Sequence, residues 1–389
     1  MSDHLPHELI FDILCVLPVK SIIRFKSVSK SWRSLFEEPS FLDSHRKQAN
    51  KSLIIQTGDL RRTNSTNFVA SDLDSLDRFK EITFPPDLGR SSYSGVTVMG
   101  SCNGLVALSC TYGEMRTGIE IREDVIIWNI STTERQIIPD PFWKGYYTCL
   151  PGTANVGFGY DSVSDSYKIV KIVHPGSNLL PVLYNLKRNE VSWRLGKFRG
   201  PDSGLHVLAR GLLFEESLHW VALLHETKKC IIVGFGLENE EFYQVPLPDC
   251  AESSIAVGVL GTCLSMTDTY TFRQPWGEIW VWVMNKYMVK ESWTKIYRID
   301  VIGNVLGSPV GGDRILLLGC VERNLYLYDP VKKESSKVVE IPGGFWDGLV
   351  YQEGFTKISA ILGALPTRRI FKRNAYEEYY TWRKKRPTH

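Results

Sequence analysis

The stretch LPHELIFDILCVLPVKSIIRFKSVSKSWRSLFEEPSF (residues 5–41) has a helical pattern, and it differs from everything that follows it in the chain. Its first half carries an apolar stripe with a spacing of four residues, as on one face of an amphipathic helix. Pro6 fits the first turn of this helix, and Pro18 ends it because proline disfavours a helical conformation in the preceding residue. The stripe consists of Leu5, Leu9, Ile10, Ile13, Leu14 and Leu17.

The rest of this stretch predicts two more short helices and a closing turn. A second amphipathic segment begins at Val19, and a third is capped by Ser29 or Ser31 and carries Trp32, Leu35 and Phe36. Pro39 starts the closing turn, which contains Phe41. Three short helices cannot bury so many large side chains among themselves, and each one left exposed forgoes roughly 1.5–3 kcal/mol. Either the body of the same chain or another protein must cover them.

This segment resembles the F-box, the helical module that docks Skp-type adaptors of cullin-RING ubiquitin ligases. The resemblance rests on Leu5-Pro6, Glu8, Ile13-Leu14, Leu17-Pro18, Val19-Lys20, Arg24-Phe25, Val28, Lys30 to Trp32, and Phe41. It implies an adaptor-binding surface made of Leu5, Pro6, Leu9, Ile10, Ile13, Leu14, Leu17 and Pro18. It also implies that Trp32, Leu35, Phe36 and Phe41 hold the module together or brace it against the next domain.

From Lys51 onward a unit of about fifty residues recurs in place of the helical pattern. Each copy has an apolar strand that ends in an aromatic residue, a polar turn and a further strand, and each is preceded by another apolar pair. Four short strands per unit are typical of a β-propeller, in which stacked sheets cover one another. The aligned aromatic residues are Trp128, Tyr184, Phe235, Trp282 and Tyr328.

The unit predicts an all-β propeller, with six blades preferred and seven as the alternative. SLIIQTGD (52–59) starts a blade ahead of the first aligned copy, and GLVYQEGFTKISAIL (348–362) offers strands to complete it. Such pairing would close the ring and remove its open edges. The predicted domains are a helical module at 1–46, a propeller at 47–366 and a basic C-terminal tail at 367–389.

The body resembles the F-box-associated interaction domain of a large plant family that includes kelch-like and S-locus F-box proteins. The similar segments include GSCNGLVAL, GFGYDSVSDSYKIVKI, LHWVAL, VGFGLENEEF and LYDPVKKE. The chain departs from that family at WNISTTER, where a proline commonly follows the asparagine, and in its long basic tail.

Bulk properties limit the compartment and the partners. The formal net charge is only +3, although the tail from Thr367 to His389 has eight basic residues against two acidic ones. Such a tail could bind nucleic acid, an acidic partner or the nuclear import machinery, but a solvated terminal segment is the favoured interpretation. The eight cysteines form no C-x-x-C pair and lie mostly in apolar runs, which favours a reducing compartment. With neither a secretory signal nor an apolar run long enough to span a membrane, we expect a cytoplasmic or nuclear protein and no membrane partner.

The sequence offers little for catalysis, metal binding or a cofactor. The eight histidines lack metal-site spacing, GFGYD and GFGLE lack the third glycine of a dinucleotide site, and DSVSDS (161–166) fits a hairpin turn better than a calcium loop. His219 is interpreted as a structural histidine, with a position in the propeller channel as the alternative. Trp143, Tyr146 and Tyr147 are candidate anchors for a protein target, with packing over a blade end as the alternative.

The resemblance implies a non-catalytic substrate receptor of an SCF-type E3 ubiquitin ligase. The helical module would bind the Skp-type adaptor and, through it, the cullin and the RING subunit, while the propeller would bind an unknown protein target. The chief alternative is a propeller enzyme or sugar-binding module with a helical cap, which would require a cluster of carboxylates, histidines or a metal in the channel. A weaker one is an F-box scaffold that acts without ubiquitin transfer.

Overall fold

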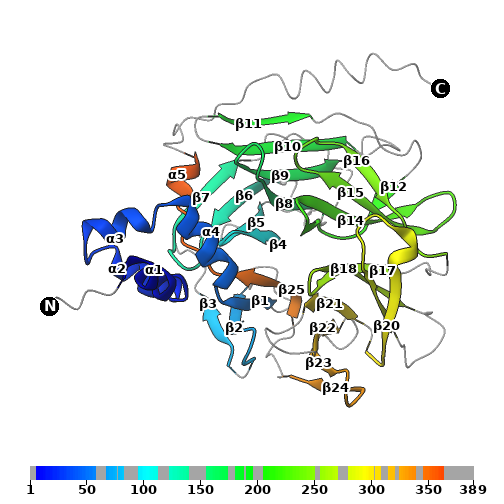
Figure 1. The fold of residues 1–389 in the computed structure, drawn as a ribbon. Coiled ribbons are helices and arrows are strands. Elements are labelled where there is room, and N and C mark those ends of the chain that lie inside the picture. The colour runs from blue at the N-terminus through cyan, green and yellow to red at the C-terminus, as the bar shows by residue number, and fades with distance from the viewer. Residues whose placement is uncertain are drawn as a thin grey trace.

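The computed structural model has a helical head followed by a ring of six β-sheets (Figure 1). It describes residues 6–57, 67–76, 78–82, 95–112, 122–139, 155–173, 180–187, 190–195, 205–249, 255–269, 279–301, 303–307, 314–319, 324–338 and 345–362.

Four helices form the head: α1 (His7–Cys15), α2 (Val19–Phe25), α3 (Lys30–Leu35) and α4 (Pro39–Gln48). Pro6 and Pro18 immediately precede α1 and α2. Ser29 caps α3, since its Oγ accepts a hydrogen bond from the Trp32 backbone N–H at 3.1 Å. The closing turn expected at Pro39 is instead a ten-residue helix. Proline suits its first position, and Arg46 and Lys47 in its last turn interact favourably with the negative end of the helix dipole.

Twenty-five strands make up the six blades in the part of the chain that the structure describes. The first blade consists of β25 (Phe345–Gln352), β1 (Lys51–Thr57), β2 (Asn67–Asp72) and β3 (Lys80–Ile82). The second consists of β4 (Gly95–Cys102), β5 (Leu105–Tyr112), β6 (Arg122–Trp128) and β7 (Arg135–Pro139). The third consists of β8 (Val156–Asp161), β9 (Ser166–Val173), β10 (Leu180–Lys187) and β11 (Glu190–Leu195).

The fourth blade differs because two short strands share its inner edge. β12 (Leu205–Val207) and β13 (Leu212–Phe214) both pair with β14 (Ser217–Leu224), which is followed by β15 (Cys230–Gly236) and β16 (Phe242–Val245). The fifth blade consists of β17 (Ile255–Leu260), β18 (Cys263–Thr269), β19 (Ile279–Met284) and β20 (Trp293–Ile299), with a short 3-10 helix, η3 (Lys290–Ser292), before β20. The sixth consists of β21 (Gly303–Gly307), β22 (Ile315–Gly319), β23 (Leu325–Asp329) and β24 (Glu334–Lys337).

The preferred count of six blades is confirmed, and so is the repeat on which it was based. All five aligned aromatic residues lie on the third strand of a blade, and all five are buried. The prediction missed β2, β12 and β21. Of these, β21 has the sequence GNVLG, which carries almost no strand pattern.

The C-terminal strand closes the ring, as predicted. β25 pairs antiparallel with β1, with Leu349 opposite Ile54 and Val350 opposite Leu53. The predicted late strands extend too far, however, because residues after Gln352 leave the sheet and Ile358–Leu362 form the short helix α5. Closure joins the two ends of the propeller and pairs the edge of β1 that would otherwise be open.

Six apolar cores hold the blades together, one between each pair of neighbouring sheets. Each sheet therefore buries both of its faces, which a lone four-stranded sheet cannot do. Glycines allow the inner strands to approach closely. A Cβ added at Gly157 of β8 would lie 2.8 Å from the Leu218 side chain, and one at Gly258 of β17 would lie 2.7 Å from the Val305 carbonyl oxygen.

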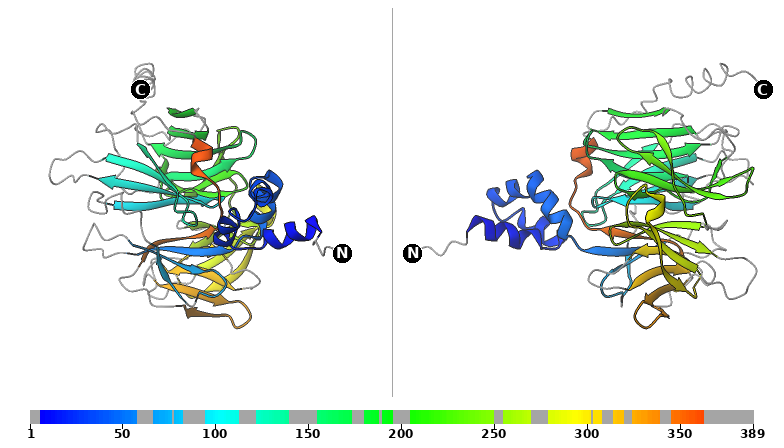
Figure 2. Two further views of the ribbon diagram at one scale, coloured as in Figure 1. Left: turned by 90° about the vertical axis from the view of Figure 1, so that its left-hand side faces the viewer. Right: turned by 45° about the vertical axis from the view of Figure 1, so that its right-hand side comes forward.

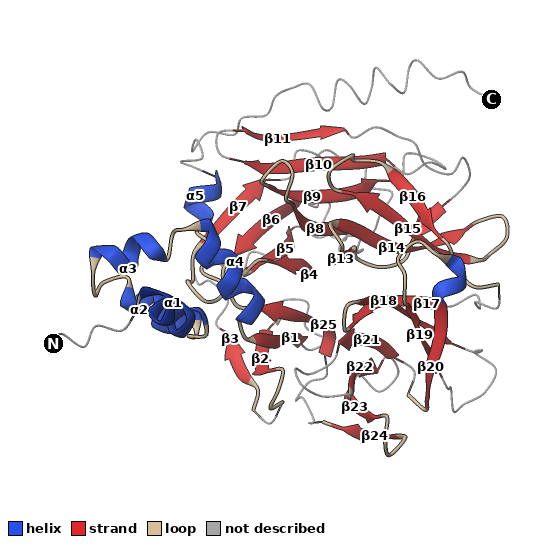
Figure 3. Ribbon diagram, in the orientation of Figure 1, coloured by secondary structure: helices blue, strands red, loops and turns tan. Residues whose placement is uncertain are grey.

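The head lies at one face of the ring, which we call the head-side face (Figure 2). Figure 3 distinguishes the helices of the head from the strands of the ring. Lys51, the first residue of β1, pairs with Gln352, the last residue of β25, so β25 runs from the opposite, distal face toward the head. β4 runs in the same direction, since Ser101 near its end donates a hydrogen bond to the Val350 carbonyl near the end of β25 at 3.0 Å. Within the described ranges, no helix is both long and apolar enough to cross a bilayer.

Candidate functional site

The inner side of the head is an apolar core built from all four helices. Leu14 and Cys15 of α1 meet Val19 and Ile22 of α2, and Leu35, Phe36 and Phe41 complete the cluster. Phe11 packs edge-on against Phe41, with ring centroids 5.5 Å apart. One further member, Phe355, comes from beyond the last propeller strand. The head is therefore not completed by its own helices alone.

The opposite side of α1 is apolar and exposed. Leu9, Ile13 and Val16 have exposed fractions of 49%, 52% and 60%. Their spacing of four and then three residues places them along one face of α1 and its C-cap, and we call these three residues the apolar ridge. Ile23 and Val28 are also exposed, so five of the ten exposed large hydrophobic residues in the described chain lie between positions 9 and 28. Such clustering marks an interaction surface.

The structure divides the predicted adaptor-binding residues into three groups. Pro6, Leu9, Ile13 and Pro18 are exposed; Ile10 and Leu17 are partly buried against the head core; and Leu14 is buried, with 2% exposed. Leu5 lies outside the described residues. Sequence reasoning missed Val16, although its position three residues after Ile13 could have identified it.

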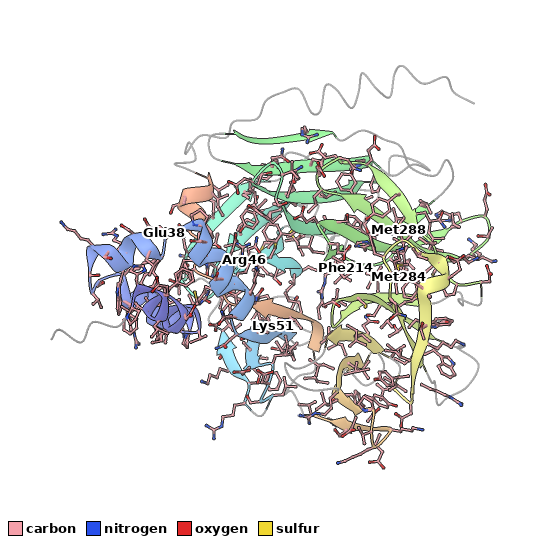
Figure 4. The ribbon with its side chains drawn as sticks, in the orientation of Figure 1. Glu38, Arg46, Lys51, Phe214, Met284 and Met288 are labelled. Atoms are coloured by element: carbon pink, nitrogen blue, oxygen red, sulfur yellow. The ribbon has the colours of Figure 1, made fainter. Side chains whose placement is uncertain are left out.

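Two titratable groups lie where the head meets the propeller. Burial lowers the pKa of His45, whose Nε2 lies 3.0 Å from the Leu17 carbonyl oxygen. Burial, reinforced by the nearby Lys357 ammonium, also lowers the pKa of Lys26. Figure 4 shows Glu38, Arg46 and Lys51 along the path from α4 into β1.

The predicted target-binding residues Trp143, Tyr146 and Tyr147 lie outside the described residues. The strands on either side of them are described. β8 runs alongside β4 in the same direction, since Phe158 faces Gly100 and the Cys102 thiol at the end of β4 forms a hydrogen bond with the backbone of Tyr160 near the end of β8. It therefore begins at the distal face. β5, β6 and β7 are successively antiparallel, so β7 runs opposite to β4 and ends, at Pro139, at the distal face.

The other sequence motifs have structural roles. Asp161 caps the predicted hairpin turn, because its Oδ1 accepts hydrogen bonds from Val163 N–H at 3.1 Å and Ser164 N–H at 3.4 Å. The glycines of GFGYD and GFGLE lie within or at the ends of β8 and β15. The described residues contain no cluster of three or more histidine, cysteine, aspartate or glutamate side chains suited to a metal ion.

His219 is a buried structural histidine, as interpreted from the sequence. It is fully enclosed, and its Nε2 lies 2.6 Å from the Tyr287 hydroxyl, which in turn lies 2.6 Å from the Tyr243 hydroxyl. Burial lowers the pKa of His219 to about 4, so its imidazole is neutral at pH 7. Phe214 packs against this group, and Met284 belongs to the same apolar core; Figure 4 labels both residues.

An ion pair connects opposite blades at the centre of the ring. Arg210 lies in the break between β12 and β13 of the fourth blade, and its guanidinium pairs with the Asp347 carboxylate on β25 of the first blade. The same guanidinium donates to the Gly348 carbonyl oxygen at 2.6 Å. Both charged side chains are less than a third exposed, so this pair is shielded from solvent more than a surface pair is.

Comparison with known proteins identifies both parts of the chain. Residues 2–44 match the F-box domain, and residues 80–345 match the F-box associated beta propeller domain. The chain is 29% identical over 326 residues to the Arabidopsis thaliana F-box protein CPR1, covering 76% of this chain and 73% of that protein. It is 26% identical over 352 residues to the F-box/kelch-repeat protein At3g23880 of the same plant, covering 84% and 88%.

Among solved structures, one chain of a nidogen/laminin complex covers 79% of this chain and 100% of its own length, at 9% identity and a TM-score of 0.48. The two domain matches show the family. The chain joins an F-box with an exposed apolar ridge to a six-bladed ring, and it belongs to the family of F-box proteins with an F-box-associated β-propeller.

Proposed function

We propose that this chain is the substrate-recognition subunit of an SCF-type E3 ubiquitin ligase. The head binds a Skp-type adaptor through the apolar ridge, and the adaptor connects it to the cullin and the RING subunit. The ring binds a protein target. The observation that carries this proposal is the exposure of Leu9, Ile13 and Val16 on a helix whose other face is already buried.

In this role the chain performs no bond chemistry of its own. It holds a target near the ubiquitin thioester of another enzyme, so the rate gain comes from proximity. Such a receptor acts in the cytoplasm or nucleus, where the ubiquitin machinery and reduced cysteines are found. The five described cysteines form no disulfide bond, in agreement with that compartment.

For the target surface we retain Trp143, Tyr146 and Tyr147 as the proposed anchors. Support comes from the strands that flank them, because β8 begins at the distal face, away from the head. A target bound there would not compete with the adaptor for space. Aromatic residues also make efficient anchors in protein interfaces.

Capture by a purified Skp-type adaptor tests the docking surface, with Ile13→Asp as the informative variant. Ile13 is half exposed, so the head should still fold. A carboxylate forced into an apolar interface costs several kcal/mol, and about 1.4 kcal/mol is already a tenfold loss of affinity. We therefore expect wild type to be captured and Ile13→Asp to be lost.

Val331→Asp is the matched control, because Val331 is 84% exposed on a turn of the sixth blade and receives the same change in charge. It should be captured like wild type. Leu14→Asp is unsuitable, since it would place a charge in the head core. Equal capture of Ile13→Asp and wild type would reject the ridge as the docking surface. Failure of wild type to bind would reject the proposal and favour a propeller that binds its own ligand.

A further inference from the structure

The segment that follows the last propeller strand connects the ring to the head. We call residues 353–357 the C-terminal strap; it lies between β25 and α5. Its first residue, Glu353, donates its backbone N–H to the Asn50 carbonyl oxygen at 3.0 Å, just after the end of α4. The preceding residue, Gln352, donates its side-chain amide to the Arg46 carbonyl of α4. The strap therefore starts against the last helix of the head.

From the strap, Phe355 enters the core of the head. It is 5% exposed and belongs to the cluster formed by the head helices. Its ring centroid lies 5.0 Å from that of His45 and 6.1 Å from that of Phe41, and the Lys26 ammonium lies 5.2 Å from it on the α2 side. This packing combines apolar burial with a cation–π contact.

The other side of the strap is bonded to the second blade. Asn129, a fully buried residue at the end of β6, donates from Nδ2 to the carbonyl oxygens of Gly354 and Thr356, both at 3.0 Å. The Thr356 hydroxyl donates to the Asn103 carbonyl oxygen at 2.8 Å. These bonds hold the backbone on both sides of Phe355.

Backbone packing leaves the strap no room to shift. Gly104 has a φ of +81°, and a Cβ added there would lie 2.5 Å from the Gly354 Cα, so the two glycines are in direct contact. Beyond the strap, the Glu134 carboxylate accepts hydrogen bonds from the backbone N–H groups of Ile358 at 2.9 Å and Ser359 at 2.7 Å. The strap is thus held along its whole length.

We propose that Phe355 is a positioning residue that fixes the orientation of the head relative to the propeller. Domains joined by a small polar interface move relative to one another by default. Here an aromatic side chain from the strap is part of the core of the head, so head and ring behave as one rigid body. In a ligase subunit, the rigid connection holds the apolar ridge and the ring at a fixed separation, which keeps a bound target close to the ubiquitin thioester. The rigid connection does not depend on the proposed function. Its effect on ubiquitin transfer does rest on the proposed function.

Distance measurement between the two parts tests the rigid connection in the full chain. Labels are introduced as unnatural amino acids at the exposed residues Lys30 on α3 and Lys332 on the sixth blade. Pulsed electron paramagnetic resonance between the two spin labels should give one narrow distance distribution for wild type and a broader one for Phe355→Ala. Phe355→Leu, which keeps most of the apolar volume, should lie between them and serves as the readout if the alanine variant does not fold.

Phe242→Ala is the matched control, because Phe242 is similarly buried, at 7% exposed, but lies on β16 of the fourth blade. It removes the same side chain and should leave the distribution narrow. If neither Phe355 variant has a broader distance distribution than Phe242→Ala, the positioning role is wrong. This conclusion holds whether or not the chain binds the adaptor.

The effect on ubiquitin transfer is measured on the lysines of the propeller itself. In a complex reconstituted with adaptor, cullin, RING subunit and conjugating enzyme, mass spectrometry maps which of these lysines receive ubiquitin. With every complex assembled at saturating adaptor, wild type should modify a restricted set of lysines, and Phe355→Ala a wider one. An unchanged set overturns this consequence. If wild type fails to capture the adaptor, the proposed function fails instead, and the distance measurement still decides the rigid connection.

Discussion

At the scale of single residues, His219 shows how burial controls protonation. Its ring is enclosed by Phe214, Tyr243 and Tyr287, and burial lowers its pKa from 6.5 to about 4. In the unfolded chain a histidine binds a proton as the pH falls below about 6.5. Between that pH and 4 the unfolded state therefore binds more protons, and acid favours unfolding. Above 6.5 both states are neutral, and the group adds no pH dependence.

We predict that His219→Gln makes stability less sensitive to acid. Glutamine keeps a polar group near the Tyr287 hydroxyl but cannot titrate. Between pH 6.5 and 4.5 wild type should lose on the order of 2 kcal/mol more than the variant, from about 1.4 kcal/mol per pH unit. Urea denaturation at several pH values measures this difference. His45, whose pKa is also lowered, titrates equally in both proteins. Parallel pH curves would contradict the assignment.

Residue patterns predicted the amphipathic helix α1 but not which of its apolar side chains face outward. Ile13 and Leu14 are neighbours in the same apolar stripe, yet one is half exposed and the other is buried. Periodicity could not separate them, because α1 is apolar on two faces. The direction of the head core depends in part on Phe355, which lies more than 300 residues later in the chain. No local pattern carries that information.

At the scale of elements, the ion pair between Arg210 and Asp347 links the closing strand to the opposite blade. Arg210 lies where the inner strand of the fourth blade is interrupted. We predict that Arg210→Met and Asp347→Asn each lower the free energy of unfolding by about 1–3 kcal/mol, since each leaves a shielded partner without its bond. The double variant should lose less than the sum of the two.

A double-mutant cycle in chemical denaturation gives the coupling energy of this pair directly. A coupling above the additivity limit of roughly 0.5 kcal/mol supports a direct interaction between the closing strand and the fourth blade. Losses that simply add would show that the two residues act independently.

The strands that could be predicted from the sequence are those with large apolar and aromatic residues that become buried. The third strand of each repeated blade ends in, or contains, a buried aromatic residue, and these strands set the period and the blade count. β21 and the segment after Gln352 were misassigned for opposite reasons. GNVLG is glycine-rich and packs by close backbone approach, whereas Ile358 to Leu362 is apolar but is started as a helix by Glu134 of another blade.

In the whole molecule, the described residues leave one face of the head uncovered. The strap covers the inner side of the head, and the apolar ridge on α1 remains exposed. The family was predictable from the sequence because the head and the repeat each carry a dense pattern. The manner of their connection was not, since it depends on hydrogen bonds between residues far apart in the chain.

Hydrogen–deuterium exchange of the full chain, with and without a saturating Skp-type adaptor, tests this claim most directly. Adaptor binding should slow exchange in residues 7–28, which contain α1 and α2, and leave the described propeller strands unchanged. Slower exchange confined to the propeller, or no change in residues 7–28, would show that the adaptor does not bind the exposed face of the head.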